Sequence, residues 1–181
     1  MNHSCGQVIW ITGLSGAGKT TLAKTLLPHL PQPRLLLDGD EMREALAPLA
    51  GGYEPKNRKQ LAFAYARLCK LAAIQGISVV CATISMFHDV HRWNRDNLPG
   101  YVEVYLDMPE AVCRERDYKK VYHTHACAGQ ETPVVGRDFA QEPPEYPDII
   151  IHDSALSVIE ITDSILQYLS AQDGHNILDS D

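Results

Sequence analysis

Glycine, lysine and threonine stand near the N-terminus at a spacing that suits phosphate binding. Residues 13–20, GLSGAGKT, fit the pattern G-x-x-x-x-G-K-S/T. In such a turn the backbone N–H groups point toward phosphate oxygens, and the positive end of a following helix adds to the attraction. Lys19 can then reach the β- and γ-phosphates, and the Thr20 hydroxyl can take a place on Mg²⁺. The segment therefore predicts a site for a nucleoside triphosphate.

The residues on either side of this turn supply the elements that the motif requires. Residues 8–11 form an apolar run that predicts a buried strand, and apolar residues follow at helical spacing within 22–27. Because the pattern stands between a strand and a helix, we prefer a phosphate site to a chance glycine-rich turn. The residues expected to contact the nucleotide are Gly13, Ser15, Gly16, Ala17, Gly18, Lys19, Thr20 and Thr21.

Two carboxylates and an arginine follow the next apolar run. Asp38 and Asp40, beside a triphosphate, could hold Mg²⁺ through water, and one could accept the proton of an attacking hydroxyl. Arg43 would then bind an anionic acceptor. The alternative is a plain turn followed by a helix that Asp40 caps. We expect Lys19 and Asp40 to be catalytic and Asp40 to join Thr20 at the metal, with Asp38 as a catalytic or supporting carboxylate.

A phosphate-binding turn alone does not separate a kinase from a GTPase or a motor ATPase. A guanine-binding GTPase needs an N/T-K-x-D segment after a late strand, and the sequence contains none. Residues 107–109, Asp-Met-Pro, do not fit that pattern. The acidic pair after the second apolar run is what the sequence offers instead, and it favours a kinase.

Four segments together carry a resemblance to one family. They are GLSGAGKTT at 13–21, LDGD at 37–40 followed by Arg43, Ile84 and Ser85 after a strand, and VEVYLDMPEAVCRERD at 102–117. Over residues 8–153 the chain resembles the adenylylsulfate (APS) kinase family. The resemblance implies a doubly wound P-loop fold and ATP as donor. It also implies phosphoryl transfer to the 3′-hydroxyl of a nucleotide-type acceptor.

By position, the resemblance also implies roles for single residues. Asp40 would be the base or the ligand of Mg²⁺-bound water, and Arg43 would contact the acceptor. Ser85 matches the family's serine near the transferred phosphate, so the resemblance places it among the catalytic residues as well as the acceptor contacts. A covalent intermediate on Ser85 is disfavoured, because direct in-line transfer needs only positioning and charge stabilisation. Arg116 matches the arginine that lies against the donor adenine, although an exposed charge at a helix end is the plain alternative.

Residues 117–147 have weak periodicity and correspond to the family's lid. Lys119 and Lys120 could neutralise transition-state charge there, and we take Lys119 as the substrate contact, with a plain surface pair as the alternative. His123 and His125 are spaced like metal ligands. No carboxylate or thiol partner accompanies them convincingly, so we expect solvated histidines.

The departures from the family fall on acceptor recognition. The family opens its long helix with D-R-x-x-N, and residues 57–61 here retain Arg58 but place Leu61 at the asparagine position. The family's F-T-G-I-D segment supplies an aromatic face for the acceptor base, and residues 134–138 read VVGRD. Because stacking on an aromatic ring contributes about 1–3 kcal/mol, affinity for the usual acceptor should be reduced.

The loop at 84–87, Ile-Ser-Met-Phe, is similar to that of relatives that phosphorylate cytidine diphosphoramidate. Phe87 or Trp93 could supply the missing ring, with core aromatics as the alternative. We therefore predict a kinase whose acceptor contacts include Arg43, Arg58, Ile84, Ser85, Phe87 and Lys119. An orthodox adenylylsulfate kinase and a non-catalytic ATP-binding regulatory domain are the other readings. Relatives are often dimers, so the resemblance also implies a homodimer, although no apolar stripe specifies an interface.

Apolar runs alternate with helical patterns along the whole chain. Strands are expected at 8–11, 34–37, 77–82, 101–106 and 149–151, and helices at 41–47, 56–75, 90–97, 109–116 and 157–169. This alternation predicts an α/β P-loop NTPase fold, with a mostly parallel five-stranded sheet covered on both faces. We expect one domain over residues 1–171 and a flexible acidic tail over 172–181.

Composition limits the kinds of partner. A net charge of −7 argues against a general nucleic-acid surface. No apolar run approaches the roughly 20 residues that span a bilayer. The five scattered cysteines favour free thiols in a reducing compartment, and the N-terminus leads almost directly into the first strand, which leaves no room for a signal peptide. We therefore expect a cytoplasmic enzyme that uses ATP, Mg²⁺ and a small-molecule acceptor.

Overall fold

The protein folds around a parallel β-sheet. The computed structural model describes residues 5–46, 54–116, 141–152 and 154–176. Within these residues five strands pair in the order β2-β3-β1-β4-β5, and every pair is parallel. The strands are β1 (Val8–Gly13), β2 (Arg34–Asp38), β3 (Ser78–Ala82), β4 (Tyr101–Leu106) and β5 (Ile149–Ile151). The predicted fold class is confirmed.

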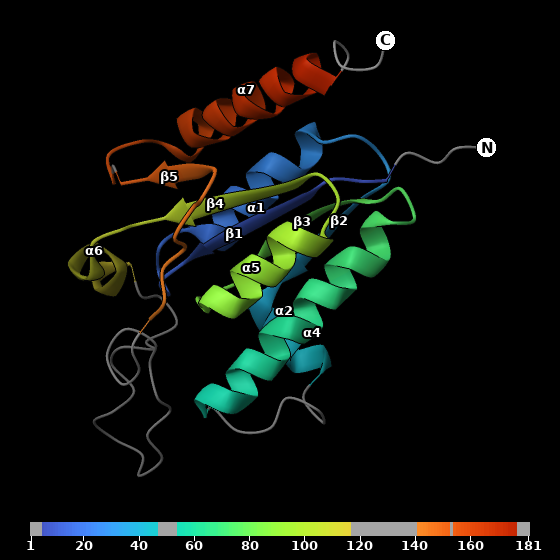
Figure 1. Ribbon diagram of the computed structural model, residues 1–181. Helices are drawn as coiled ribbons and strands as arrows, with labels where there is room; N and C mark the ends of the chain where they lie inside the picture. The colour runs from blue at the N-terminus through green and yellow to red at the C-terminus, as the bar shows by residue number, and fades with distance from the viewer. Residues whose placement is uncertain (1–4, 47–53, 117–140, 153, 177–181) are drawn as a thin grey trace.

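Helices cover both faces of the sheet (Figure 1). They are α1 (Lys19–Leu26), α2 (Gly39–Ala45), α4 (Pro55–Ala73), α5 (His88–Asn97), α6 (Glu110–Glu115), α7 (Val158–Asn176) and the 3₁₀ turn η1 (Leu27–His29). α1 and α7 pack together on one face, and α4 and α5 pack together on the other. None of the described helices combines the length and the apolar character that crossing a membrane requires.

The central strand β1 is buried along its whole length. Ile9 lies in one core cluster with Leu22 of α1 and Ile165 of α7. Trp10, on the opposite face, lies in a second cluster with Cys69 of α4. A strand that is covered on both faces has no side chain in water, which explains its continuous apolar sequence.

All five strands run in the same direction, so their carboxyl ends meet at one edge of the sheet. The pairing aligns Gly13 of β1 with Leu106 of β4, and Asp38 of β2 with Ala82 of β3. The turn after β1, the helix α2 and residues 83–87 therefore gather at this edge. Open parallel sheets bind their ligands there.

The last helix is longer than predicted. α7 continues to Asn176, whereas the apolar pattern ends at Leu169. The apolar pattern in the sequence indicates only the part of the helix whose side chains are buried. Its polar continuation keeps helical contacts, for example the hydrogen bond of 2.9 Å from Ser170 Oγ to the carbonyl of Leu166.

The cysteines of the described segments are free thiols, as predicted. Cys69, Cys81 and Cys113 are buried, and Cys5 is exposed. In the same segments, no group of three or more histidine, cysteine, aspartate or glutamate side chains could hold a metal ion.

Candidate active site

The turn between β1 and α1 takes a conformation that needs glycine. Gly18, just before α1, has a φ of 97°, a left-handed value that residues with a Cβ rarely adopt. Gly16 has a φ of 79°, and a Cβ there would lie 2.3 Å from the carbonyl oxygen of Cys113 in α6. The glycines thus allow both the turn itself and the close packing of α6 against it.

Lys19 is the first residue of α1 and turns its side chain back over the turn. Its ammonium group donates a hydrogen bond of 2.6 Å to the carbonyl of Leu14. Burial raises the pKa of the Cys113 thiol, and the nearby charges of Lys19 and Arg116 oppose that rise. A positive charge is therefore held at the turn that the motif predicts to bind phosphate.

Thr20 and Asp38 join this turn to the end of β2. The Thr20 hydroxyl donates to Asp38 Oδ2 at 2.6 Å, and Asp38 Oδ1 accepts the backbone N–H of Asp40 at 3.0 Å. Asp38 is buried and caps α2, which therefore begins at Gly39 rather than at the expected residue 41. The alternative in which Asp40 caps this helix is wrong, because the carboxylate two residues earlier takes that place.

Asp40 and Arg43 stand on α2 above a tyrosine of α4. They are three residues apart on the helix, with Asp40 exposed and Arg43 half-buried. The Tyr65 hydroxyl donates to the carbonyl of Gly39 at 3.3 Å. Burial raises the pKa of Tyr65 well above its ordinary value, Arg43 lowers it and Asp40 raises it, so the hydroxyl stays a donor at neutral pH. Tyr65 falls within the helix expected at 56–75, and nothing in the sequence indicates a partner for its hydroxyl, although a buried tyrosine hydroxyl needs one.

The loop after β3 is held by hydrogen bonds within itself and to β1. The hydroxyls of Thr83 and Ser85 lie 2.8 Å apart, and both residues are buried. Thr12 of β1 donates to the carbonyl of Ile84 at 2.6 Å. The N–H of Phe87 donates to the carbonyl of Ser85 at 3.0 Å. Of the acceptor contacts predicted here, Ser85 is tucked under the loop, and Ile84 and Phe87 are half-buried.

Arg116 ends α6 and reaches the segment after β5. Its Nη2 donates to the carbonyl of Ser154 at 3.1 Å. Nearby, Asp107 accepts the Tyr105 hydroxyl at 3.0 Å and lies 2.9 Å from His152 Nδ1. Sequence reasoning did not single out His152, because only the pairing of β4 with β5 brings it beside Asp107.

Other predicted contacts have different outcomes. Arg58 is half-buried in the first turns of α4, which packs against α2. Trp93 meets Phe63 edge-on, with 6.4 Å between ring centroids, and Arg67 lies over both rings at 5.5 Å. Trp93 therefore belongs to the interface of α4 and α5, as the alternative of a packed aromatic predicts. Some of the positions considered in the sequence lie outside the described residues. They are Lys119, Lys120, His123, His125, Cys127 and residues 134–138.

A family model that matches most of the chain shows which family the protein belongs to. The adenylylsulphate kinase family model matches residues 5–152. The chain belongs to the adenylylsulphate kinase family. It is therefore an ATP-dependent phosphotransferase, as the resemblance implied.

Relatives of this family member include kinases named for two different acceptors. A cytidine diphosphoramidate kinase from Campylobacter jejuni is 37% identical over 158 residues, which cover 84% of this chain and 89% of that protein. An adenylyl-sulfate kinase from Paraburkholderia xenovorans is 37% identical over 174 residues, which cover 93% of this chain and 96% of that protein.

A solved structure agrees with the family assignment. The APS kinase of Mycobacterium tuberculosis, in complex with AMPPNP and APS, matches with a TM-score of 0.79 and 29% identity. The match covers 92% of this chain and 98% of that one. The doubly wound P-loop fold of the family is therefore also the fold of this chain.

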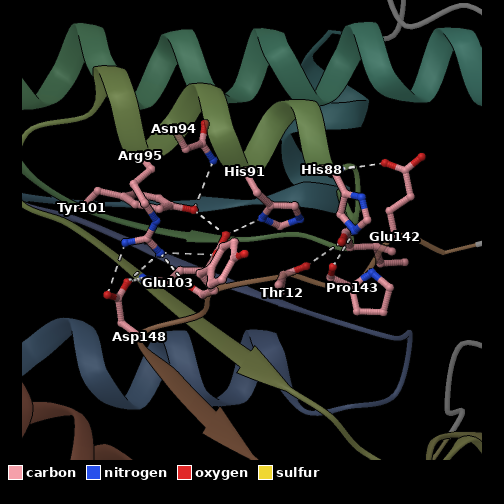
Figure 2. Close-up of polar contacts among 12 residues, drawn as sticks. Thr12, His88, His91, Asn94, Arg95, Tyr101, Glu103, Glu142, Pro143 and Asp148 are labelled. Carbon is pink, nitrogen blue, oxygen red and sulfur yellow. Dashed lines mark hydrogen bonds and ion pairs between the residues drawn. The ribbon is translucent and has the colours of Figure 1, made fainter.

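On the side of the sheet that α5 covers, this adenylylsulphate kinase family member holds a polar network centred on the buried Glu103 (Figure 2). Glu103 of β4 accepts the Tyr101 hydroxyl at 2.7 Å and pairs with His91 and Arg95 of α5. Asp148 accepts the N–H of Glu103 at 2.7 Å and pairs with Arg95 at 3.1 Å. Burial raises the pKa of Tyr101 well above its usual range, and Glu103 adds to that rise. The network ties α5, β4 and the residues before β5 together, and sequence reasoning missed it.

Proposed function

We propose that this kinase transfers the γ-phosphoryl group of ATP to the ribose 3′-hydroxyl of cytidine diphosphoramidate, or of a closely similar nucleotide, rather than to that of adenylylsulfate. The observation that carries the choice of acceptor is Leu61. It stands where the family has an asparagine, and its side chain is buried in the core face of α4 among apolar residues. Leu61 therefore offers an acceptor no polar group.

The donor side rests on the turn between β1 and α1. The amides of residues 13–18 would receive the phosphates, and Lys19 would neutralise their charge. The Thr20 hydroxyl and the Asp38 carboxylate supply oxygen atoms, the type of ligand that Mg²⁺ prefers, so these residues fit the ion. Asp40 would hold it through water. Bound Mg²⁺ would offset the negative charge on the β- and γ-phosphates during transfer.

The acceptor side rests on α2. Asp40 is exposed at the carboxyl edge of the sheet, and Asp38 is the residue that caps α2. It would accept the proton of the 3′-hydroxyl while the new bond from phosphorus to the 3′-oxygen forms. The bond between the γ-phosphorus and the β-phosphate oxygen breaks at the same time, and ADP leaves. Arg43, on the same side of α2, would bind a phosphate of the acceptor.

A coupled assay of ADP release tests this proposal with two acceptors. We expect turnover with ATP and cytidine diphosphoramidate, and kcat/KM with adenylylsulfate lower by about tenfold or more, as the loss of one base-stacking contact predicts. Equal or better turnover of adenylylsulfate would overturn the choice of acceptor. ATP binding without ADP release for either acceptor would favour a non-catalytic domain.

An orthodox adenylylsulfate kinase is the second candidate. The Paraburkholderia xenovorans relative, an adenylyl-sulfate kinase, is as similar to this chain as the Campylobacter jejuni relative is. Under this alternative, Phe87 has no special part in acceptor binding. Replacing Phe87 by leucine would then leave the KM for adenylylsulfate unchanged.

A further inference from the structure

Glu142 and Pro143 form hydrogen bonds with the loop that leads into α5. The carboxylate of Glu142 accepts the N–H of His88 at 2.7 Å. The N–H of Glu142 donates to the carbonyl of Met86 at 3.3 Å, and His88 Nε2 lies 3.0 Å from the carbonyl oxygen of Pro143. Figure 2 shows His88, Glu142 and Pro143 together at this point. We call these contacts of Met86, His88, Glu142 and Pro143 the Glu142 clamp.

The Glu142 clamp replaces a cap that α5 does not supply for itself. Phe87 occupies the position before α5 and gives it no side-chain hydrogen bond. The first N–H groups of a helix need acceptors, and an anionic one is favoured by the helix dipole. The Glu142 carboxylate meets both conditions from a position 54 residues away.

The Glu142 clamp holds the backbone on both sides of Phe87. Met86, on one side, is buried in the core that α1 and α7 cover. His88, on the other side, is fixed through its N–H and its ring. The Phe87 side chain is half-buried and packs against the core cluster of α4. Its ring therefore has little freedom to move away from the carboxyl edge of the sheet.

We propose that Glu142 and His88 are positioning residues that set acceptor affinity by fixing Phe87. The inference rests on the proposed function, and it takes Phe87 as the ring that contacts the acceptor, one of the two aromatic residues that the sequence suggested for this role. Neither Glu142 nor His88 needs to touch a substrate for this role. Loss of the Glu142 carboxylate would release the first turn of α5 and let Phe87 adopt other positions. Acceptor binding would then weaken, whereas the ATP side, formed by β1 and α1, would not change.

Steady-state kinetics of Glu142→Ala and Glu142→Gln test the role. Glutamine keeps an oxygen that can accept the N–H of His88, so it should preserve most of the clamp. We expect Glu142→Ala to raise the KM for the acceptor by about tenfold, as the loss of one good hydrogen bond predicts, and to leave the KM for ATP unchanged. Glu142→Gln should restore most of the acceptor affinity. Glu145→Ala is the matched control, because the Glu145 carboxylate lies 3.9 Å from His88 Nδ1 and makes none of the clamp's hydrogen bonds.

A double-mutant cycle separates positioning from plain stability. If Glu142 acts through Phe87, Glu142→Ala should add little to the acceptor KM in a Phe87→Leu background. Should Glu142→Ala fold poorly, His88→Ala removes one contact of the clamp and should raise the acceptor KM in the same direction. A lower melting temperature with an unchanged acceptor KM, or fully additive effects, would overturn the inference alone. No turnover by the wild-type protein with either acceptor would overturn the proposed function, and the inference with it.

Discussion

The Thr20 hydroxyl donates to the Asp38 carboxylate at 2.6 Å, although β3 lies between the strands that lead to the two residues. Thr20 is placed by the turn after β1, and Asp38 by the end of β2. Two oxygen groups of the kind that bind Mg²⁺ therefore meet only when the sheet has formed. Asp38 therefore contacts the helix that follows the phosphate-binding turn.

Replacing Asp38 by asparagine tests the importance of this pair. Asparagine keeps the shape and one acceptor oxygen but removes the charge that would attract Mg²⁺. We expect kcat to fall by about 10²-fold or more, with an unchanged circular dichroism spectrum. ADP release at saturating ATP and acceptor measures the change. Thr20→Ser keeps the hydroxyl and serves as the control with near-normal activity. A kcat close to that of the wild type in Asp38→Asn would show that this charge is not needed.

Arg43→Ala tests the acceptor side. A charged hydrogen bond to an anionic acceptor is lost, so the acceptor KM should rise by about 10- to 100-fold while the KM for ATP stays the same. Initial rates over a range of both substrates give the two values. Arg92→Ala removes an exposed arginine from α5 and should change neither KM. An unchanged acceptor KM in Arg43→Ala would remove Arg43 from the site.

The phosphate-binding turn could be predicted because its signals are local. Gly18 needs a left-handed φ, and Lys19 follows it at the start of the helix, so both positions are legible in one short segment. The contact of Thr20 with Asp38 could not be predicted in the same way. It depends on β3 pairing between β1 and β2, which residues far along the chain decide.

The polar network around Glu103 could not be predicted from local sequence either. In the sequence, Glu103 is a single charge in an apolar strand, and nothing near it identifies its partners. His91 and Arg95 come from the preceding helix, and Asp148 comes from 45 residues later. Only the packing of α5 on β4 and the pairing of β4 with β5 bring them together.

The first turn of α7 gives a prediction about pH. Glu160 accepts the N–H of Ser157 at 2.8 Å, and the N–H of Glu160 donates to Ser157 Oγ at 3.2 Å, which is a reciprocal cap. The hydrogen bonds from Ser157 lower the pKa of Glu160 in the folded protein. The charged form is thus favoured by folding. The charged Glu160 cap therefore adds to the free energy of unfolding at pH values above the ordinary glutamate pKa of about 4.3. This contribution is lost as the pH falls through the lowered pKa of the folded protein.

Thermal unfolding of Glu160→Gln between neutral and acidic pH checks this sign. The variant should melt below the wild type at neutral pH, and the two melting temperatures should converge in acid. Asp163→Asn removes an exposed charge from the same helix and should show a much smaller pH dependence. A difference for Glu160→Gln that grows as the pH falls would contradict the capping role.

Glu103→Ala should be the most destabilising of these changes. Glu103 is 2% exposed, and its removal leaves the Tyr101 hydroxyl and His91 in the interior without their carboxylate partner. Leaving a buried polar group without its partner costs about 1–3 kcal/mol for each group, so urea unfolding should show a loss of a few kcal/mol. Glu103→Gln keeps an acceptor oxygen and should lose less. A loss below about 1 kcal/mol for Glu103→Ala would mean that water replaces the carboxylate, and that the network orients α5 without stabilising the fold.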